Sequence, residues 1–228
     1  MKHDVVYILK NDIDSDEIKY SLRSVEKNFP CNKVWIYGGK PKGIEPDEYV
    51  EVKQKGATRY SKVTNTIKQI CMNDDITEKF WLFNDDFFVT KPVGSFLQVA
   101  DGSIAHRVQR ISSITGTKSR YAEALERTAG LLHSKGYDTL CYAVHLPMLV
   151  DRAKALEAME EFPGEPMFRC IYGNYAAEAT VITPDVKVFG CNKPDDDWFF
   201  LSTDDRAWSA EAGEYIRDMF RSPSRWER

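Results

Sequence analysis

The sequence of 228 residues lacks an apolar run of membrane-spanning length, and its five cysteines lack the paired close spacing of a zinc knuckle. An odd number of scattered cysteines also argues against a disulfide framework, so we expect buried free thiols. The first apolar stretch is short and has no small-residue cleavage site, which is typical of a strand and not of a signal peptide. We therefore expect a cytoplasmic protein.

A stripe of basic residues is also missing. The net charge is −4, and lysine and arginine are scattered along the chain, so a large nucleic-acid partner is disfavoured. Hydrophobic residues make up 43% and charged residues 29%, which is an ordinary globular balance. The composition predicts a folded protein whose local basic groups can still hold a phosphate.

The first hundred residues alternate between two hydrophobic periods. Apolar residues at helical spacing predict helices over residues 18–29, where Pro30 ends the pattern, and 63–71. Strands are predicted over residues 5–9, 33–37, 49–52 and 80–83. The last strand is apolar on both faces and should lie centrally in the sheet. This order predicts an α/β fold with a doubly wound mixed sheet.

The alternation loosens in the second half. We expect a strand over residues 103–108, extended chain over 181–189, and helices over 121–132, 149–161 and 207–220. Residues 116–119 superficially resemble the end of a phosphate-binding loop, but the preceding glycine and strand are wrong, so we assign them to a loop. We expect one domain over 1–228, with an α/β core over 1–100 and a C-terminal helical lobe over 101–228.

Asp85 and Asp86 directly follow the most apolar strand, and ligands of open α/β sheets bind at such strand ends. Two adjacent carboxylates repel each other unless a cation compensates them, and Mg²⁺ or Mn²⁺ bridging a diphosphate would do so. The alternative is that the two acids cap a turn. Phenylalanines on both sides of the pair favour the metal interpretation, because exposed turns are rarely surrounded by aromatic residues.

Two segments resemble the Stealth family, which includes capsular polysaccharide phosphotransferases and the lysosomal-enzyme N-acetylglucosamine-1-phosphotransferase. They are EIKYSLRSVEKN at residues 17–28 and KFWLFNDDFF at residues 79–88. Later elements are similar to further blocks of the family, namely His145 to Pro147, Phe168 with Arg169, residues 189–197, and residues 220–227. The family's usual opening block with Trp-Val-Asp-Gly is absent.

The resemblance implies a donor site and a metal site. It assigns the metal to Asp85, Asp86 and Asp196, and the nucleotide-sugar or its phosphates to Arg23, Asn65, Asn84 and Asn192. Each assignment has a simpler alternative. Arg23 could pair with Glu17 or Glu26 on the surface, Asn65 could cap a helix that it opens, and residues 195–197 could form a solvated acidic turn.

Catalytic roles fall to His145, Arg169 and Asp86. An imidazole can take a proton from an acceptor hydroxyl at neutral pH, and His106 and His133 compete with His145 for this role. Arg169 would neutralise a phosphate oxygen, or would alternatively form a buried ion pair with Glu165 or Glu178.

The predicted function is metal-dependent transfer of a sugar-1-phosphate from a nucleotide-sugar, with a UDP-sugar favoured, to a hydroxyl of a glycan or related acceptor. The resemblance implies a GT-A-like, Rossmann-like core over 1–100 that binds the nucleotide-sugar and an acceptor and catalytic lobe over 101–228. Two alternatives stay open: a GT-A-like glycosyltransferase that releases nucleoside diphosphate, and a binding module of the same fold without catalysis.

Overall fold

A computed structural model describes residues 2–11, 16–94, 96–115, 119–164, 166–176, 178, 180–192 and 197–228. Its centre is a five-stranded sheet with the order β3-β2-β1-β4-β7. The first four strands are parallel, and β7 pairs antiparallel with β4. The strands are β1 (His3–Leu9), β2 (Cys31–Gly38), β3 (Glu48–Val50), β4 (Lys79–Phe83) and β7 (Met148–Asp151). β4 lies between β1 and β7, as the sequence predicts.

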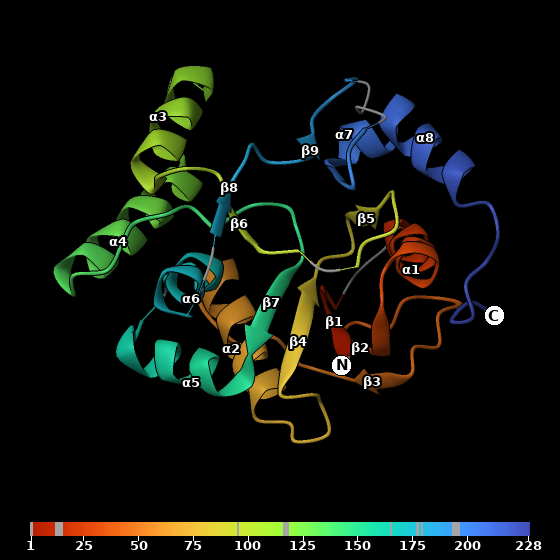
Figure 1. Cartoon of the computed structure of the whole chain (residues 1–228), viewed down its shortest axis with the longest axis horizontal. Helices are drawn as coiled ribbons and strands as arrows, with labels where there is room; N and C mark the ends of the chain where they lie inside the picture. Colours follow the sequence, from red (N-terminus) through yellow and green to blue (C-terminus); the bar gives the residue numbers. More distant parts are fainter. Residues whose placement is uncertain are drawn as a thin grey trace.

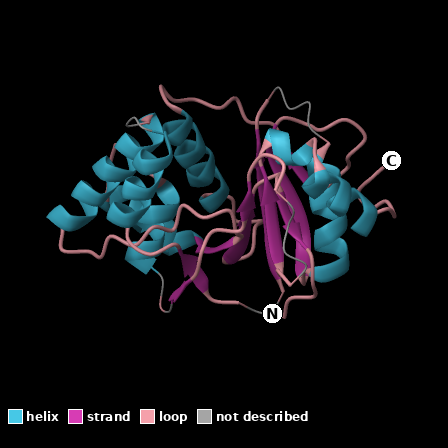
Figure 2. Ribbon diagram, turned by 90° about the horizontal axis from the view of Figure 1, so that it is seen from above, coloured by secondary structure: helices cyan, strands magenta, loops and turns pink. Residues whose placement is uncertain are grey.

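The two faces of this sheet are covered by different helices, because successive side chains of a strand point to opposite faces (Figure 2). Val5 and Tyr7 pack against α1 (Glu17–Asn28), whereas Val6 packs against α2 (Arg59–Cys71) and α5 (Arg152–Glu161). Fully buried aliphatic side chains such as Val5 and Val6 contribute about 1.5–3 kcal/mol each to stability. The doubly wound mixed sheet is thereby confirmed.

A helical lobe stands beside the sheet (Figure 1). It contains α3 (Ile104–Thr115), α4 (Arg120–Ser134) and α6 (Phe168–Ala176), which share an apolar core around Leu125 and Ile171. The short strands β6 (Gln98–Ala100) and β8 (Thr180–Ile182) pair in parallel next to this lobe. The expected C-terminal helical lobe is therefore present, and the fifth strand of the central sheet, β7, also comes from this half of the chain.

The last part of the chain returns to the first helix. β10 (Phe200–Thr203) joins β5 (Phe87–Val89) and β9 (Lys187–Val188) in a three-stranded sheet. Beyond it, α7 (Asp205–Trp208) and α8 (Glu211–Met219) pack over Phe88, whose ring stacks on Trp208 with centroids 5.5 Å apart. Tyr20 of α1 contacts the same tryptophan, so both ends of the chain share one apolar cluster.

Three of the expected elements differ in the structure. Residues 103–108, expected as a strand, lie mostly in α3, because Ile104 and Arg107 are buried at helical spacing. Residues 149–161 begin as β7, and the helix starts only at Arg152 after the Asp151 side chain caps it. Residues 207–220 form two helices separated at Ser209 and Ala210.

The break between α7 and α8 depends on Gly213. A Cβ at this position would lie 1.8 Å from the Trp208 carbonyl oxygen, so only glycine lets the first turn of α8 approach the end of α7.

The remaining sequence expectations concern loops, thiols and membrane spans. Residues 116–118 of the expected loop lie outside the described residues, and Ser119 caps α4. All five cysteines are free thiols, of which Cys71, Cys141 and Cys170 are buried and Cys191 is exposed. None of the helices within the described ranges has the length and apolar character that crossing a membrane requires.

Candidate functional site

A cavity of about 640 Å³ opens where β1 and β4 end. Its polar lining residues come from the loop after β1, the loop before α2, the first turn of α2, the end of β4 and the start of α6. They are Lys10, Asn11, Gln54, Thr58, Arg59, Tyr60, Lys62, Asn84, Asp85 and Arg169. The carboxyl ends of parallel strands therefore meet at this cavity, as expected for the ligand site of an open α/β sheet.

Asp85 is the acidic residue of the cavity. Burial, and after it the neighbouring charge of Asp86, raise the pKa of its carboxyl to about 6. The ammonium groups of Lys10 and Lys187 oppose this shift only in part. A buried carboxylate that is costly to ionise gains from a nearby cation, so Asp85 favours a metal ion or another cationic partner.

Asp86 has its own charge partner. Its Oδ2 accepts hydrogen bonds from Lys187 Nζ at 2.8 Å and from Ser202 Oγ at 2.9 Å. Both partners come from the three-stranded sheet, from β9 and β10 respectively. The adjacent aspartates therefore have different surroundings: Asp85 lines the cavity, whereas Asp86 ties the end of β4 to the second sheet.

His145 forms a pair with Asp185. The Nδ1 atom of His145 lies 2.7 Å from Asp185 Oδ2, and the backbone N–H of His145 donates to Asp185 Oδ1 at 2.8 Å. Although burial alone would raise the pKa of Asp185, these two hydrogen bonds and the charges of His145 and Arg107 hold it well below its usual range. Asp185 thus stays ionised and fixes the orientation of the imidazole.

Arg107 extends this pair into the helical lobe. Its Nη2 donates to Asp185 Oδ2 at 3.1 Å and its Nη1 to Asp101 Oδ2 at 2.5 Å, and its side chain is only 8% exposed. α3 therefore supplies the cation that compensates Asp185.

Arg169 is a buried cation of the site with one donor that is unpaired in the described part of the chain. Its Nη1 donates to the Leu146 carbonyl at 2.7 Å, but its buried Nη2 has no hydrogen-bond partner among the described residues. Burial lowers the pKa of Arg169 to about 10, although Asp86 and Asp185 act in the opposite direction. A buried guanidinium with an unused donor favours an anionic ligand such as a phosphate.

Phe87 brings these groups together. The Arg169 guanidinium lies 5.4 Å from the centre of the Phe87 ring, and the His145 ring lies 6.4 Å from it. His145 and Arg169 thus both contact the ring of Phe87, which directly follows Asp86 in the chain.

The structure therefore gathers five of the sequence-predicted residues in one region: Asn84, Asp85, Asp86, His145 and Arg169. His106 and His133, the competing histidines, are exposed on α3 and α4. Glu178, one expected partner of Arg169, pairs instead with Lys154, and Glu165 lies outside the described residues.

Arg23 lies elsewhere, on α1. Its Nε donates to Glu227 Oε1 at 2.8 Å, its Nη1 donates to the Phe220 carbonyl at 2.9 Å, and its guanidinium covers Tyr20. The structure thus gives Arg23 a carboxylate partner near the C-terminus, in place of the expected Glu17 or Glu26.

The remaining predicted residues are also apart from the cluster or outside the described chain. Asn65 lies in the middle of α2 and donates to the Lys55 carbonyl, so the expectation that it opens a helix is wrong. α2 begins earlier because Thr58 and Ser61 form a capping box. Asn192 is exposed and donates to the Phe189 carbonyl. Asp196, with Asp195, lies outside the described residues, and Asp197 pairs with Lys91.

Sequence reasoning missed Asp185, Lys187, Lys10 and Gln54. The first two flank Val186 in a short segment after Pro184. Their partners, His145 and Asp86, are 40 and 101 residues away in the chain, so the local sequence does not predict these pairs.

The donor set fits a metal that a substrate helps to hold. Within the described ranges, no cluster of three His, Cys, Asp or Glu side chains could form a complete cation site. Mg²⁺ usually binds through one or two carboxylates together with substrate phosphates. Asp85 suits that arrangement, and Asn84 beside it offers an amide oxygen, whereas Lys187 already compensates Asp86.

Comparisons with known proteins show the fold. No protein-family model and no curated protein matches the chain. A crystal structure of an active-site mutant of LgtC is 10% identical, with a TM-score of 0.51, over 97% of this chain and 96% of that one. A structure of the galactosyltransferase LgtC with donor and acceptor sugar analogues is 9% identical over 82% and 75% of the two chains, with a TM-score of 0.44. The chain therefore has a GT-A-like fold.

Proposed function

We propose that the protein is a metal-dependent transferase that passes a sugar-1-phosphate from a nucleotide-sugar, preferably a UDP-sugar, to a hydroxyl of a glycan or related acceptor. One observation carries the proposal: the His145–Asp185 pair and the unsatisfied Nη2 of Arg169 lie together beside the carboxylates that end β4. The resemblance of residues 17–28 and 79–88 to the Stealth family supports the same reaction.

The cavity at the end of β1 and β4 suits the donor. Its volume of about 640 Å³ is within the range of small-molecule sites, and its wall carries amide, hydroxyl and cationic groups. Gln54 and Asn11 can recognise a base or ribose, whereas Lys10 and Arg169 can meet the diphosphate. A divalent metal held by Asp85 and the donor would neutralise charge on the leaving nucleotide.

His145 suits the acceptor. Because its Nδ1 is held by Asp185, Nε2 is the ring nitrogen that takes a proton, and ionised Asp185 stabilises the imidazolium that results. The acceptor oxygen forms a bond to the sugar-side phosphorus, and the bond from that phosphorus to the bridging oxygen of the nucleoside monophosphate breaks. Arg169 offsets negative charge on the transferred phosphoryl group.

The positions of these residues in the chain also support separate donor and acceptor parts. Lys10, Gln54 and Asp85 lie within residues 1–100, whereas His145, Arg169 and Asp185 lie within residues 101–228. The donor would thus bind mainly to the first part and the acceptor to the second.

A second candidate is a glycosyltransferase, which the GT-A-like fold shared with LgtC favours. In that reaction the acceptor oxygen attacks the anomeric carbon, the bond from this carbon to the phosphate oxygen breaks, and nucleoside diphosphate leaves. The same histidine and the same carboxylates would serve both reactions.

Phosphorus NMR separates the candidates. The protein is incubated with UDP-sugars, Mn²⁺ or Mg²⁺ and hydroxyl acceptors, and His145→Ala is the inactive control. UMP together with a sugar phosphodiester is the expected result. UDP as the product would support the glycosyltransferase, and binding of the donor without turnover would support a binding module of the same fold.

A further inference from the structure

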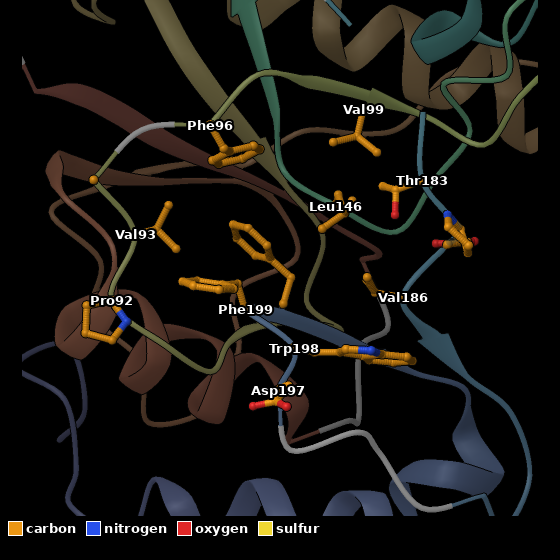
Figure 3. A pocket seen from close by; sticks show the side chains of 14 residues that line it. Pro92, Val93, Phe96, Val99, Leu146, Thr183, Val186, Asp197, Trp198 and Phe199 are labelled. Atoms are coloured by element: carbon orange, nitrogen blue, oxygen red, sulfur yellow. The ribbon is translucent and has the colours of Figure 1, made fainter. Parts of the chain in front are cut away.

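A second cavity, of about 600 Å³, lies between the loop after β5 and the segment that leads into β10 (Figure 3). Phe96 and Val99 line one side of it, and Trp198 and Phe199 line the other. Neither the donor cavity nor the proposed mechanism uses this space.

The second cavity reaches the proposed base. Leu146 and Asp185 both line it, and His145 is the chain neighbour of the first and the hydrogen-bond partner of the second. The Leu146 carbonyl also accepts the hydrogen bond from Arg169, which lines the donor cavity. His145, Asp185 and Arg169 therefore connect the two cavities.

The lining of the second cavity is apolar and aromatic. Among the described residues that line it, the charged side chains are Asp185 and Asp197, and no lysine, arginine or histidine is present. Phe199 is 53% exposed, which is unusual for a phenylalanine beside three other aromatic lining residues. A phosphate would find no cationic partner among these lining residues, whereas an uncharged apolar group would bury surface against the rings.

We propose that this cavity binds an uncharged apolar group attached to the accepting sugar, so that the acceptor is a glycoside with an aryl or alkyl aglycone. This inference rests on the proposed function, because it assigns the acceptor side of the same site. Docking the aglycone against Trp198 and Phe199 would bring the sugar hydroxyl towards His145.

The test compares glycosides that differ only in the aglycone. Binding of the methyl, octyl and p-nitrophenyl glycosides of one sugar, taken in turn for several sugars, is measured by calorimetry without donor and with a chelator. For at least one sugar, the octyl or p-nitrophenyl glycoside is expected to bind on the order of tenfold more tightly than the methyl glycoside, as burial of an apolar group predicts. The tighter of the two identifies a lipid-like or an aromatic aglycone.

Phe199→Ala is expected to weaken the tighter glycoside roughly fivefold, because stacking on one wall is lost. Phe189→Ala is the matched control: Phe189 is 54% exposed but does not line the cavity, so affinity should stay unchanged. Equal affinity for all three aglycones of every sugar, an unaffected Phe199→Ala protein, or equally tight binding of p-nitrophenyl phosphate would each overturn the inference.

Failure of this inference is distinguishable from failure of the proposed function. Asp85→Asn should abolish metal-dependent donor binding and leave glycoside affinity unchanged. Glycoside binding without any turnover would refute the transferase alone, whereas turnover that ignores the aglycone would refute the acceptor assignment alone.

Discussion

Arg23 and Glu227 are 204 residues apart in the chain and form a two-pronged ion pair. Arg23 Nε and Nη2 lie 2.8 and 2.5 Å from the two carboxylate oxygens of Glu227, and both side chains are about nine-tenths buried. Glu227 also accepts from the Ser224 backbone N–H. The pair therefore fastens the end of the chain to α1.

Glu227→Gln is expected to lower the free energy of unfolding by about 1–2 kcal/mol, because a two-pronged ion pair becomes a single hydrogen bond from the guanidinium to an uncharged amide oxygen. Burial opposes ionisation of Glu227, but the hydrogen bonds from Arg23 and Ser224 lower its pKa below the usual value. The folded state therefore binds its proton less readily than the unfolded state, so the pair contributes stability above about pH 4.5 and loses it in acid. Urea unfolding at pH 7 and pH 3 should show a larger difference between the two proteins at pH 7 than at pH 3. A difference that is the same at both pH values would contradict this account.

Asp185→Asn tests the proposed base. The neutral amide no longer stabilises the imidazolium of His145, so we expect kcat to fall by about 10²–10⁴-fold with little change in donor binding. Asp218→Asn is the control, since Asp218 is 73% exposed and pairs only with a surface arginine in the described chain. The rate is followed as nucleotide release across pH 5–9. An unchanged pH profile and rate for Asp185→Asn would show that the pair is structural.

Asp85 and Asp86 should respond differently to the same substitution. Asp85→Asn removes a costly charge from the cavity and is expected to raise stability at pH 7 by about 1 kcal/mol while abolishing metal-dependent donor binding. Asp86→Asn leaves Lys187 without its carboxylate and should lower stability by about 1–3 kcal/mol. Thermal unfolding and titration of UDP-sugar with and without Mn²⁺ measure both effects. Intact metal-dependent binding in both variants would exclude the metal site.

Two glycine substitutions test the junction of α7 and α8. Gly213→Ala places a methyl group against the Trp208 carbonyl and should destabilise the protein by about 3 kcal/mol or more. Gly130→Ala is the matched change, because Gly130 lies inside α4 with open space at its Cβ position, and it should stabilise by about 0.5–1 kcal/mol. Denaturant midpoints give both values, and an equal response of the two variants would refute the close approach at Gly213.

The sequence predicts the first half of the fold well, because local patterns decide it. The hydrophobic spacing within each early strand and helix indicates its type, and Pro30 marks the end of the first helix. The start of α2 was predicted four residues late, because the Thr58 cap was not recognised. The strand predicted over residues 103–108 was wrong. The β-branched residues Ile104 and Val108 favour a strand, but Ile104 and Arg107 are buried at helical spacing and most of the segment is part of α3. β7 was predicted as part of the helix over residues 149–161, because its four residues directly precede α5.

In the candidate site, too, local segments predict some residues, whereas contacts across the fold decide others. Asp85, Asp86, His145 and Arg169 can be proposed from the sequence, since each lies in a recognisable segment. Asp185 and Lys187 cannot be assigned partners from the sequence, because their roles depend on pairing across the fold. Arg23 shows the reverse, since a resembling segment suggested a phosphate contact and the structure places a carboxylate there.

The antiparallel pairing of Lys79 with Asp151 at the β4–β7 edge has a consequence for synthesis on the ribosome. Until residue 151 has left the exit tunnel, β4 presents an open, apolar sheet edge that another chain could join. The cavity at the end of β1 and β4 also stays without Arg169 during that time, since α6 follows β7. Closure of the sheet and completion of this cavity therefore both wait for the second half of the chain, and a nascent chain that stalls at residue 100 would be prone to associate through β4.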